Sequence, residues 1–167
     1  MKHNSHLTDF PFVIEPHPFN KTSPKSMLQY SLGATLYMPG TKHVVDKIRN
    51  NALTDLTSMV MCLEDAIDEK DLEAAEQNVL EHLDALADHL GADSSALDQL
   101  PLLFVRVRNL EQFKRFSQRL TNERVQSLTG FVFPKFDSTN AAEYLEILSV
   151  VNQRLDSTLY CMPILEG

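Results

Sequence analysis

The sequence has few cysteines and no long apolar run. Cys62 and Cys161 are the two cysteines among 167 residues, and both lie in apolar, strand-like runs, where a small buried hydrophobic side chain is favoured over a ligand, a nucleophile or a disulfide partner. They indicate a reducing compartment only weakly. No window approaches the roughly 18 uninterrupted apolar residues of a membrane helix, and the first ten residues lack the apolar core of a secretory signal. We therefore expect a soluble, cytoplasmic protein without a membrane partner.

The sequence also lacks any excess of positive charge. Its 15 Lys and Arg residues are outnumbered by 23 Asp and Glu residues, which gives a net charge of −8. The acidic residues fall mostly on predicted helix surfaces and no basic stripe offsets them, so we expect no nucleic-acid partner. The apolar content of 43% is that of an ordinary globular protein.

The first thirty residues differ in composition from the rest of the chain. They hold four of the eight prolines and three of the six histidines, with no sustained period of 2 or 3.6 residues. This pattern predicts an irregular N-terminal arm over residues 1–30. His3, His6 and His17 are irregularly spaced in this polar arm, so solvated side chains are favoured over a metal site.

The remainder alternates short apolar runs with amphipathic stretches, which is typical of β/α units and a parallel sheet. Each run is continuously apolar, as in strands that are buried on both faces. The predicted strands span residues 34–38, 58–63, 102–107, 128–133 and 159–165. The predicted helices span residues 41–52, 70–90, 110–121 and 138–154.

The helix predicted over residues 70–90 has the most regular pattern. Its apolar residues recur at helical spacing, and Gly91 offers the usual C-terminal stop. His82 and His89 are seven residues apart on this helix. Because carboxylates surround them in the sequence, a solvated face is favoured over a metal site.

This order of elements is compatible with an open doubly wound sheet or with an eight-stranded barrel. Pro39-Gly40-Thr41 follows the first predicted strand and has neither glycine-rich nucleotide-binding pattern, so we expect an α/β fold of the TIM (β/α)8 barrel type. Residues 31–167 supply about five of its β/α units, so we expect the N-terminal part of a barrel domain, truncated after strand five. Open edges would leave this part alone inactive and prone to association.

Polar groups collect where the first two predicted strands end, which is where a TIM barrel builds its active site. Pro39-Gly40 forms a turn whose free amides would suit an anionic group, although a tight β-to-α turn explains the same residues equally well. Glu64 and Asp65 are adjacent carboxylates that could bind metal-bound water or carry protons. Asp65 could alternatively cap the following helix.

The last three predicted strands also end in charged residues. Arg106 and Arg108 are two residues apart, so strand periodicity points both guanidiniums to one face, where they suit bidentate binding of a carboxylate. Lys135 adds a cation or is a solvated loop residue. Glu166 stands where a divalent cation would need an oxygen ligand. Together these strand ends predict a site for a metal ion and an anionic substrate.

At these positions the sequence resembles the HpcH/HpaI aldolase and citrate lyase β-subunit family. The similarity runs from about residue 31 to residue 167, with one short motif in each β/α unit. The motifs are L-Y-M-P-G at 36–40 against L-F-V-P-G, L-E-D-A at 63–66 against L-E-D-A, V-R-V at 105–107 against V-R-V-N, G-F-V-F-P-K at 130–135 against G-I-V-L-P-K, and P-I-L-E-G at 163–167 against P-L-I-E-T. The residues of these motifs are similar to those of a divergent branch found in tellurite-resistance and stress-response gene clusters.

The resemblance implies a barrel of the phosphoenolpyruvate/pyruvate type and a Mg²⁺-dependent carbon–carbon lyase or aldolase that forms an enolate. Its substrate would be a small carboxylate or a CoA-type acyl-thioester, and the complete protein would be a homo-oligomer. The resemblance implies that Glu166 is a metal ligand, with a second carboxylate beyond Gly167, and that Arg106 holds the substrate. Glu64 and Asp65 would be catalytic residues that order the water shell of the metal. The substrate-binding residues expected at this mouth are Arg106, Arg108, Lys135, Pro39 and Gly40.

Two departures from the family motifs leave the substrate open. Arg108 stands where the third motif reads asparagine, and Gly167 stands where the fifth reads threonine. Two other functions therefore remain alternatives. One is a barrel that binds an anionic metabolite or a protein partner without turnover, and the other is an enzyme that handles phosphoenolpyruvate or phosphate with the same cations.

Overall fold

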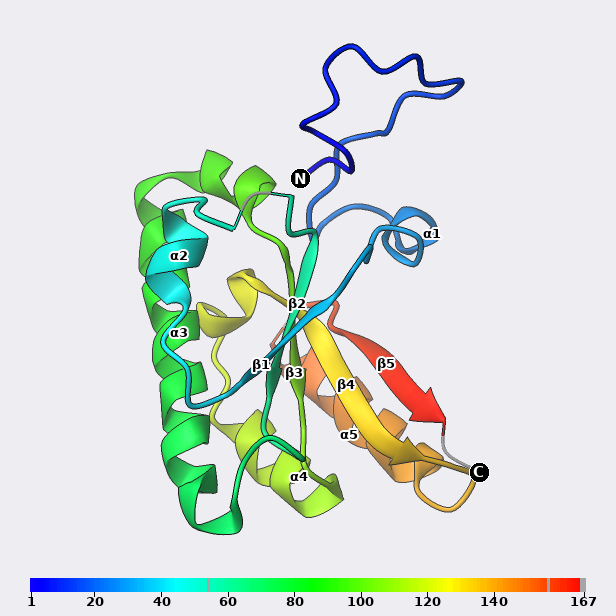
Figure 1. The fold of residues 1–167 in the computed structure, drawn as a ribbon. Helices are drawn as coiled ribbons and strands as arrows, with labels where there is room; N and C mark the ends of the chain where they lie inside the picture. The colour runs from blue at the N-terminus through cyan, green and yellow to red at the C-terminus, as the bar shows by residue number, and fades with distance from the viewer. Residues whose placement is uncertain (54, 156, 166–167) are drawn as a thin grey trace.

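The computed structural model of the chain describes residues 1–53, 55–155 and 157–165. They form parallel β-strands joined by helices (Figure 1). The strands are β1 (Leu36–Pro39), β2 (Ser58–Cys62), β3 (Leu102–Arg106), β4 (Leu128–Phe136) and β5 (Tyr160–Leu165). The helices are α1 (Lys25–Leu28), α2 (Val45–Arg49), α3 (Leu72–Ala92), α4 (Leu110–Gln118) and α5 (Ala141–Arg154), with short 3-10 turns η1 (Glu69–Asp71), η2 (Ser94–Gln99) and η3 (Arg124–Gln126).

The five strands form one sheet in the order β1-β2-β3-β4-β5, and each neighbouring pair is parallel. The predicted alternation of strands and helices is therefore confirmed, and each strand falls within three residues of its predicted ends. The helix predicted over residues 41–52 is shorter than expected and forms only as Val45–Arg49. Its first residues are held in a loop, because the amide of Lys42 donates to the carbonyl of Pro39 at 2.9 Å.

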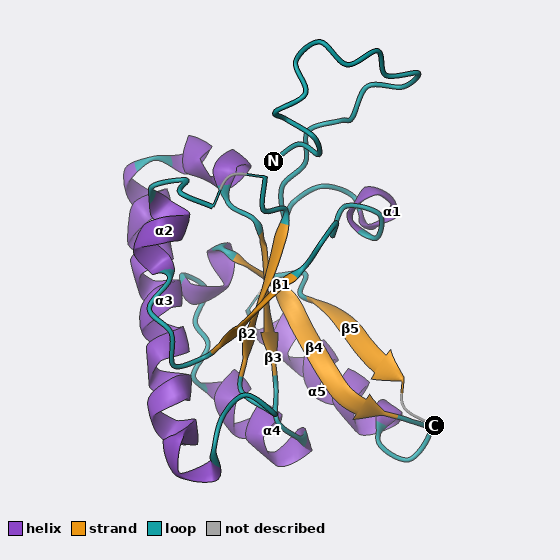
Figure 2. Ribbon diagram, in the orientation of Figure 1, coloured by secondary structure: helices purple, strands orange, loops and turns teal. Residues whose placement is uncertain are grey.

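The main core lies between the sheet and the helices α2 to α5, which cover one face (Figure 2). Side chains such as Leu63, Leu83, Phe113 and Phe131 are fully buried there. A smaller cluster lies on the opposite face of the sheet, where the N-terminal segment and α1 pack. Its buried members are Phe19, Leu28, Val60, Leu102, Phe104 and Val132.

Residues 1–30 are largely irregular, and α1 is their regular element in the described chain. The segment is anchored to the sheet, because Phe19 and Leu28 are buried against it. Cys62 is buried and Cys161 is partly buried, and both are free thiols, as the sequence predicts.

Two expectations about α3 are wrong. The helix continues through Gly91 to Ala92, and Asp93 ends it in an extended conformation while accepting from the amide of Ser95. His82 is buried rather than solvated, because it falls on the stripe of α3 that faces the core. Its Nε2 accepts from the backbone N–H of Val44 at 3.4 Å, and burial, followed by the charge of His43, lowers its pKa.

Close packing of β4 against β5 explains one glycine. A Cβ atom at Gly130 would lie 2.0 Å from the carbonyl oxygen of Tyr160, a distance that no side chain tolerates.

Within the described residues, no helix combines the length and the apolar character needed to cross a bilayer.

Candidate functional site

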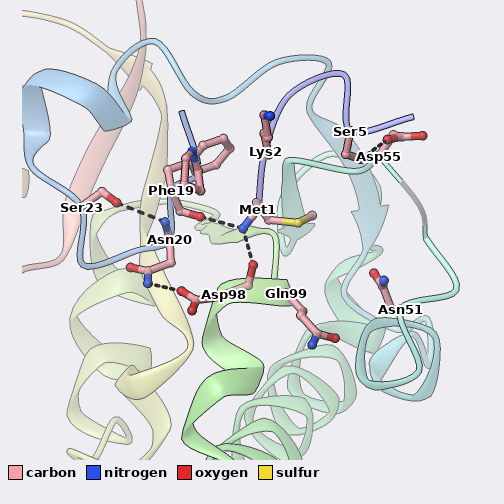
Figure 3. Close-up of a pocket in the computed structure, with 11 residues that line it drawn as sticks. Met1, Lys2, Ser5, Phe19, Asn20, Ser23, Asn51, Asp55, Asp98 and Gln99 are labelled. Carbon is pink, nitrogen blue, oxygen red and sulfur yellow. Dashed lines mark hydrogen bonds between the residues drawn. The ribbon is translucent and has the colours of Figure 1, made fainter. Parts of the chain in front are cut away.

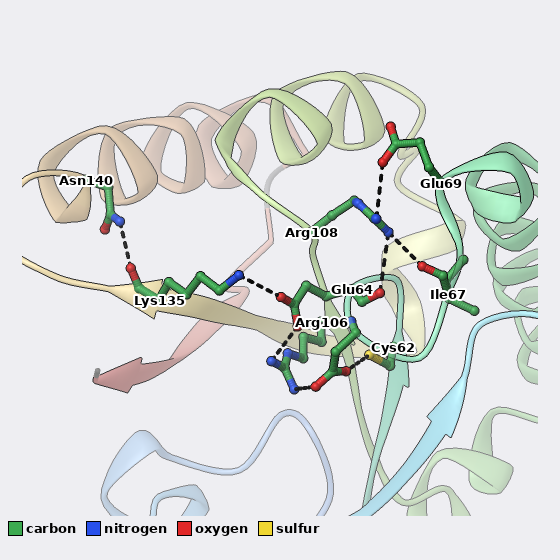
Figure 4. A network of polar contacts seen from close by, with 9 residues as sticks. Cys62, Glu64, Ile67, Glu69, Arg106, Arg108, Lys135 and Asn140 are labelled. Carbon is green, nitrogen blue, oxygen red and sulfur yellow. Dashed lines mark hydrogen bonds and ion pairs between the residues drawn. The ribbon is translucent and has the colours of Figure 1, made fainter. Parts of the chain in front are cut away.

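The C-terminal ends of β2, β3 and β4 bring together a cluster of charged side chains (Figure 4). Glu64 follows β2, Arg106 is the last residue of β3, and Lys135 is the penultimate residue of β4. Parallel strands end at the same edge of a sheet, which explains why residues about seventy positions apart meet here. We call Glu64, Asp65, Arg106 and Lys135 the strand-end cluster.

Glu64 is the centre of the strand-end cluster. Its Oε2 accepts from Nη2 of Arg106 at 2.6 Å, and its Oε1 lies 3.3 Å from Nζ of Lys135. The side chains of Glu64 and Arg106 are only 11% and 13% exposed. A buried carboxylate needs such partners, because an uncompensated charge away from water is costly. Glu64 therefore fixes the positions of two cations at the mouth of the sheet.

Asp65 adds a second carboxylate to the same guanidinium. Its Oδ2 lies 3.3 Å from Nη1 of Arg106, and its side chain is 63% exposed. The thiol of Cys62 donates to Oδ1 at 3.3 Å, and burial raises the pKa of this thiol. The alternative role of Asp65 as a helix cap is not observed, since Asp71 occupies the N-cap position of α3.

Arg108 does not join Arg106, contrary to the prediction from strand periodicity. In Figure 4, the two arginines lie on either side of Glu64. Arg108 donates through Nη1 to the carbonyl of Ile67 at 2.9 Å and pairs through Nη2 with Glu69 at 3.1 Å. The prediction is wrong because β3 ends at Arg106, and the period of 2 does not continue into the loop. Arg108 holds the loop between β2 and α3.

The turn at Pro39-Gly40 is also different from the anion site that the sequence suggested. The amide of Gly40 donates to the carbonyl of Cys62 at 2.8 Å, so it continues the sheet. Asn78 of α3 donates to the carbonyl of Gly40 at 2.6 Å. A Cβ atom at Gly40 would lie 2.7 Å from Leu63 Cδ2. The structure thus supports the alternative explanation, a tight β-to-α turn, at this glycine.

Lys135 has an unusual backbone conformation. Its φ is +48°, which lies in the left-handed region that a residue with a Cβ atom adopts at a cost. The pairing of β4 with β5 shifts between Phe133 and Phe136, and Asn140 donates to the carbonyl of Lys135 at 2.7 Å. This kink directs the ammonium toward Glu64, and it is consistent with a functional constraint on Lys135.

The charges of the strand-end cluster affect the pKa values of two tyrosines that the sequence motifs do not identify. Tyr144 of α5 is buried, and burial together with the charge of Glu64 raises its pKa to about 12. Tyr37 of β1 is 45% exposed. Partial burial raises the pKa of Tyr37, and the positive charge of Arg106 opposes this effect. The alternation of β1 could have identified Tyr37, because its neighbours Leu36 and Met38 are apolar.

A cavity of about 360 Å³ opens beside the cluster and is lined by Glu64, Asp65, Ile67, Arg108, Asn109 and Lys135. Another cavity of about 550 Å³ lies at the opposite edge of the sheet, against residues that precede β2 and β3 (Figure 3). Its polar groups bond to one another, as when Asn20 donates to Asp98 at 2.7 Å. None of the predicted site residues lines it, so the strand-end cavity is the candidate active site.

The described residues supply only part of the expected metal ligands. The carboxylates of Glu64 and Asp65 both face Arg106. Among the residues that the structure describes, no group of three or more His, Cys, Asp or Glu side chains is placed to hold a metal ion. Glu166, the metal ligand implied by the resemblance, lies outside the described residues.

The parallel β/α units and the charged strand ends define a protein of the TIM-barrel class, in which strand C-termini carry the active site. Comparison with known families gives a more specific result. Residues 26–167 match the family of C-C bond lyases of the TIM-barrel fold. The chain belongs to this family. A search among curated proteins returned no match.

Proposed function

We propose that this chain carries the substrate-binding part of a carbon–carbon lyase of the HpcH/HpaI aldolase and citrate lyase β-subunit type. The observation that carries the proposal is the bridge from Glu64 to Arg106 and Lys135 at the ends of three neighbouring strands. The bridge pairs the largely buried guanidinium of Arg106 and the exposed ammonium of Lys135 with one carboxylate, and Glu64 and Lys135 line a cavity. Cations in this arrangement suit a small, cytoplasmic carboxylate or acyl-thioester substrate.

The proposed reaction breaks the bond to the carbon next to a carboxyl or thioester group. The electron pair of that bond passes to this carbon and is shared with the neighbouring oxygen as an enolate. The other carbon of the broken bond bears a hydroxyl, which gives its proton to solvent and becomes the carbonyl of the departing fragment. A proton from solvent then converts the enolate into the second product. Arg106 donates hydrogen bonds to the substrate oxygens and stabilises the charge that develops there. Its low exposure strengthens the interaction, because little water screens it. Lys135, which is more exposed, attracts and orients the free carboxylate.

The charge balance of the cluster supports a further cation in the complete site. Glu64 and Asp65 carry two negative charges, and Arg106 and Lys135 carry two positive charges, so the cluster is neutral. A dianionic substrate needs additional positive charge. Mg²⁺, bound through Glu166, would supply it by polarising the substrate oxygen.

Calorimetry of Mg²⁺ binding to the product of the complete gene tests this proposal. We expect the wild type to bind Mg²⁺ more tightly in the presence of oxaloacetate or pyruvate, and Glu166→Gln to lose this binding. Glu69→Gln is the matched control, because Glu69 is an exposed carboxylate that pairs with Arg108 outside the cluster. If neither wild type nor control binds Mg²⁺, the lyase proposal fails and a barrel that binds anions without turnover replaces it.

A further inference from the structure

Tyr37 faces the same side of the sheet as Arg106. Its neighbours Leu36 and Met38 pack into the cluster between the sheet and the helices, and successive side chains of a strand alternate in direction. Tyr37 pairs in register with Val60, which pairs with Phe104. Val60 and Phe104 belong to the opposite, barrel-facing cluster. Arg106 follows Phe104 by two residues, so Tyr37 lies one layer below Arg106 on that face.

The side chain of Tyr37 contributes little to packing. It is 45% exposed, although Val60 and Phe104, which face this side in register with it on the two neighbouring strands, are buried. Its hydroxyl takes part in none of the side-chain hydrogen bonds between described residues. A tyrosine with an apolar body and an unoccupied polar tip is suited to contact a ligand.

Neighbouring groups of the site affect the pKa of this hydroxyl. Besides Arg106, the groups that affect the pKa of Tyr37 are Cys62 and Asp65, both of which raise it. The phenol therefore stays protonated at neutral pH and can only donate to an anionic ligand. The Nε of Arg106 is buried and has no hydrogen-bond partner among the described residues. The hydroxyl of Tyr37 and the Nε of Arg106 are thus two donors without a partner among the described residues.

We propose that Tyr37 is a specificity-determining residue of the lyase site, whose hydroxyl donates a hydrogen bond to a keto or hydroxyl oxygen of the substrate. The carboxylate of that substrate is bound by Arg106, so this inference rests on the proposed function. The favoured substrates are short acids that carry an oxygen substituent beside the carboxyl group. A site built to donate to such an oxygen discriminates against analogues that lack it.

A pair of ligands that differ in one oxygen tests this role. Oxaloacetate and succinate have the same two carboxylates, but succinate lacks the keto group. We expect Tyr37→Phe to weaken oxaloacetate binding about tenfold, the loss typical of one hydrogen bond, and to leave succinate binding unchanged within about twofold. Calorimetry with Mg²⁺ on the complete protein measures both. Tyr160→Phe is the matched control, since Tyr160 faces the same side of the sheet but lies on β5, at the opposite edge from β1.

The outcomes separate this inference from the proposed function. If Arg106→Gln loses oxaloacetate while Tyr37→Phe binds both ligands as the wild type does, the role of Tyr37 is overturned and the lyase site stands. Equal weakening of both ligands by Tyr37→Phe also overturns it. If the wild type binds no oxaloacetate, both proposals fall.

A measurement without ligand tests the placement of Tyr37. The difference in absorbance titration between wild type and Tyr37→Phe isolates the phenol of Tyr37. We expect its pKa to rise in the Arg106→Gln background, because a positive neighbour is lost, and to stay unchanged in Arg115→Gln. An unchanged pKa in Arg106→Gln would overturn the placement.

Discussion

Two glutamates with two cationic partners each, Glu64 and Glu76, occupy different layers of the molecule. Glu76 of α3 is 3% exposed and contacts Arg115 at 3.1 Å and Arg119 at 3.3 Å. Gln112 donates to it at 2.9 Å. These three partners recur along one face of α4 and its end, so this group joins two helices. The partners of Glu64 come from two strand ends, and one of them, Lys135, lines a cavity together with Glu64. Similar charge pairing therefore serves packing in one place and, in the function proposed above, ligand binding in the other.

The largest expected effect concerns the helix layer. The double substitution Arg115→Met with Arg119→Met leaves the carboxylate of Glu76 buried without a cation. We expect the free energy of unfolding to fall by about 3–5 kcal/mol, measured by urea denaturation, with oxaloacetate binding unchanged. Lys114→Met, an exposed change on the same helix, should have little effect. A loss below about 1 kcal/mol for the double variant would show that Glu76 does not depend on these arginines.

A smaller loss of stability is expected at the strand ends. Glu64→Gln keeps an acceptor for Arg106 but removes its buried counter-charge, so we expect about 1–3 kcal/mol less stability together with weaker oxaloacetate binding. The pKa of Tyr144 should also fall from about 12, because its negative neighbour is gone, while burial keeps it above the ordinary value. Absorbance titration measures this shift. Glu76→Gln is the control, and an equal shift there would remove the distinction between the two glutamates.

Substitutions at Lys135 separate backbone strain from the charge contact. Lys135→Ala and Lys135→Gly both remove the ammonium, but only glycine relieves the left-handed backbone at φ +48°. We expect the glycine variant to be more stable than the alanine variant by about 1 kcal/mol, and both to bind oxaloacetate more weakly than the wild type. Equal stability of the two variants in thermal unfolding would mean that the kink carries no strain.

A pH-dependent effect concerns Lys21, a cation that donates to the carbonyl of Val125 and, within the described chain, meets no carboxylate. Burial lowers its pKa to about 8, whereas the unfolded value is about 10.4. Between these values the unfolded chain holds more protons, so the contribution of Lys21 to stability rises from about pH 8 to about pH 10.4. We expect Lys21→Met to flatten this rise in urea denaturation. A parallel pH profile for wild type and variant would contradict the shifted pKa.

The sequence could predict the elements that depend on local pattern. Continuous apolar runs located all five strands, and the rule that parallel strands end together brought Glu64, Arg106 and Lys135 to one edge. The prediction of side-chain direction failed where the strand periodicity stopped, at the end of β3. Arg108 lies beyond β3, and the loop between β2 and α3 rather than the strand period sets its direction.

Other features of the site depend on contacts between distant segments. The left-handed φ of Lys135 has no sequence signal, because glycine would be the usual residue there. The hydrogen bond from the amide of Gly40 to the carbonyl of Cys62 could not be predicted from the sequence, because it depends on the register of β1 against β2. The alternation of Tyr37 with Leu36 and Met38 indicates from the sequence that it faces the other side of the strand. Only its exposed fraction and its charged neighbours, which the structure gives, distinguish it from an aromatic residue of the core. The expectation of a barrel truncated after strand five stays a prediction.

Calorimetric titration of oxaloacetate, in the presence of Mg²⁺, into the protein tests the central claim most directly. Arg106→Gln and Arg115→Gln each remove one guanidinium from a low-exposure glutamate, the first at the strand ends and the second in the helix layer. If the strand-end cluster binds the substrate carboxylate, Arg106→Gln weakens binding at least about thirtyfold, and Arg115→Gln binds as the wild type does. Binding by Arg106→Gln equal to that of the wild type would contradict the account.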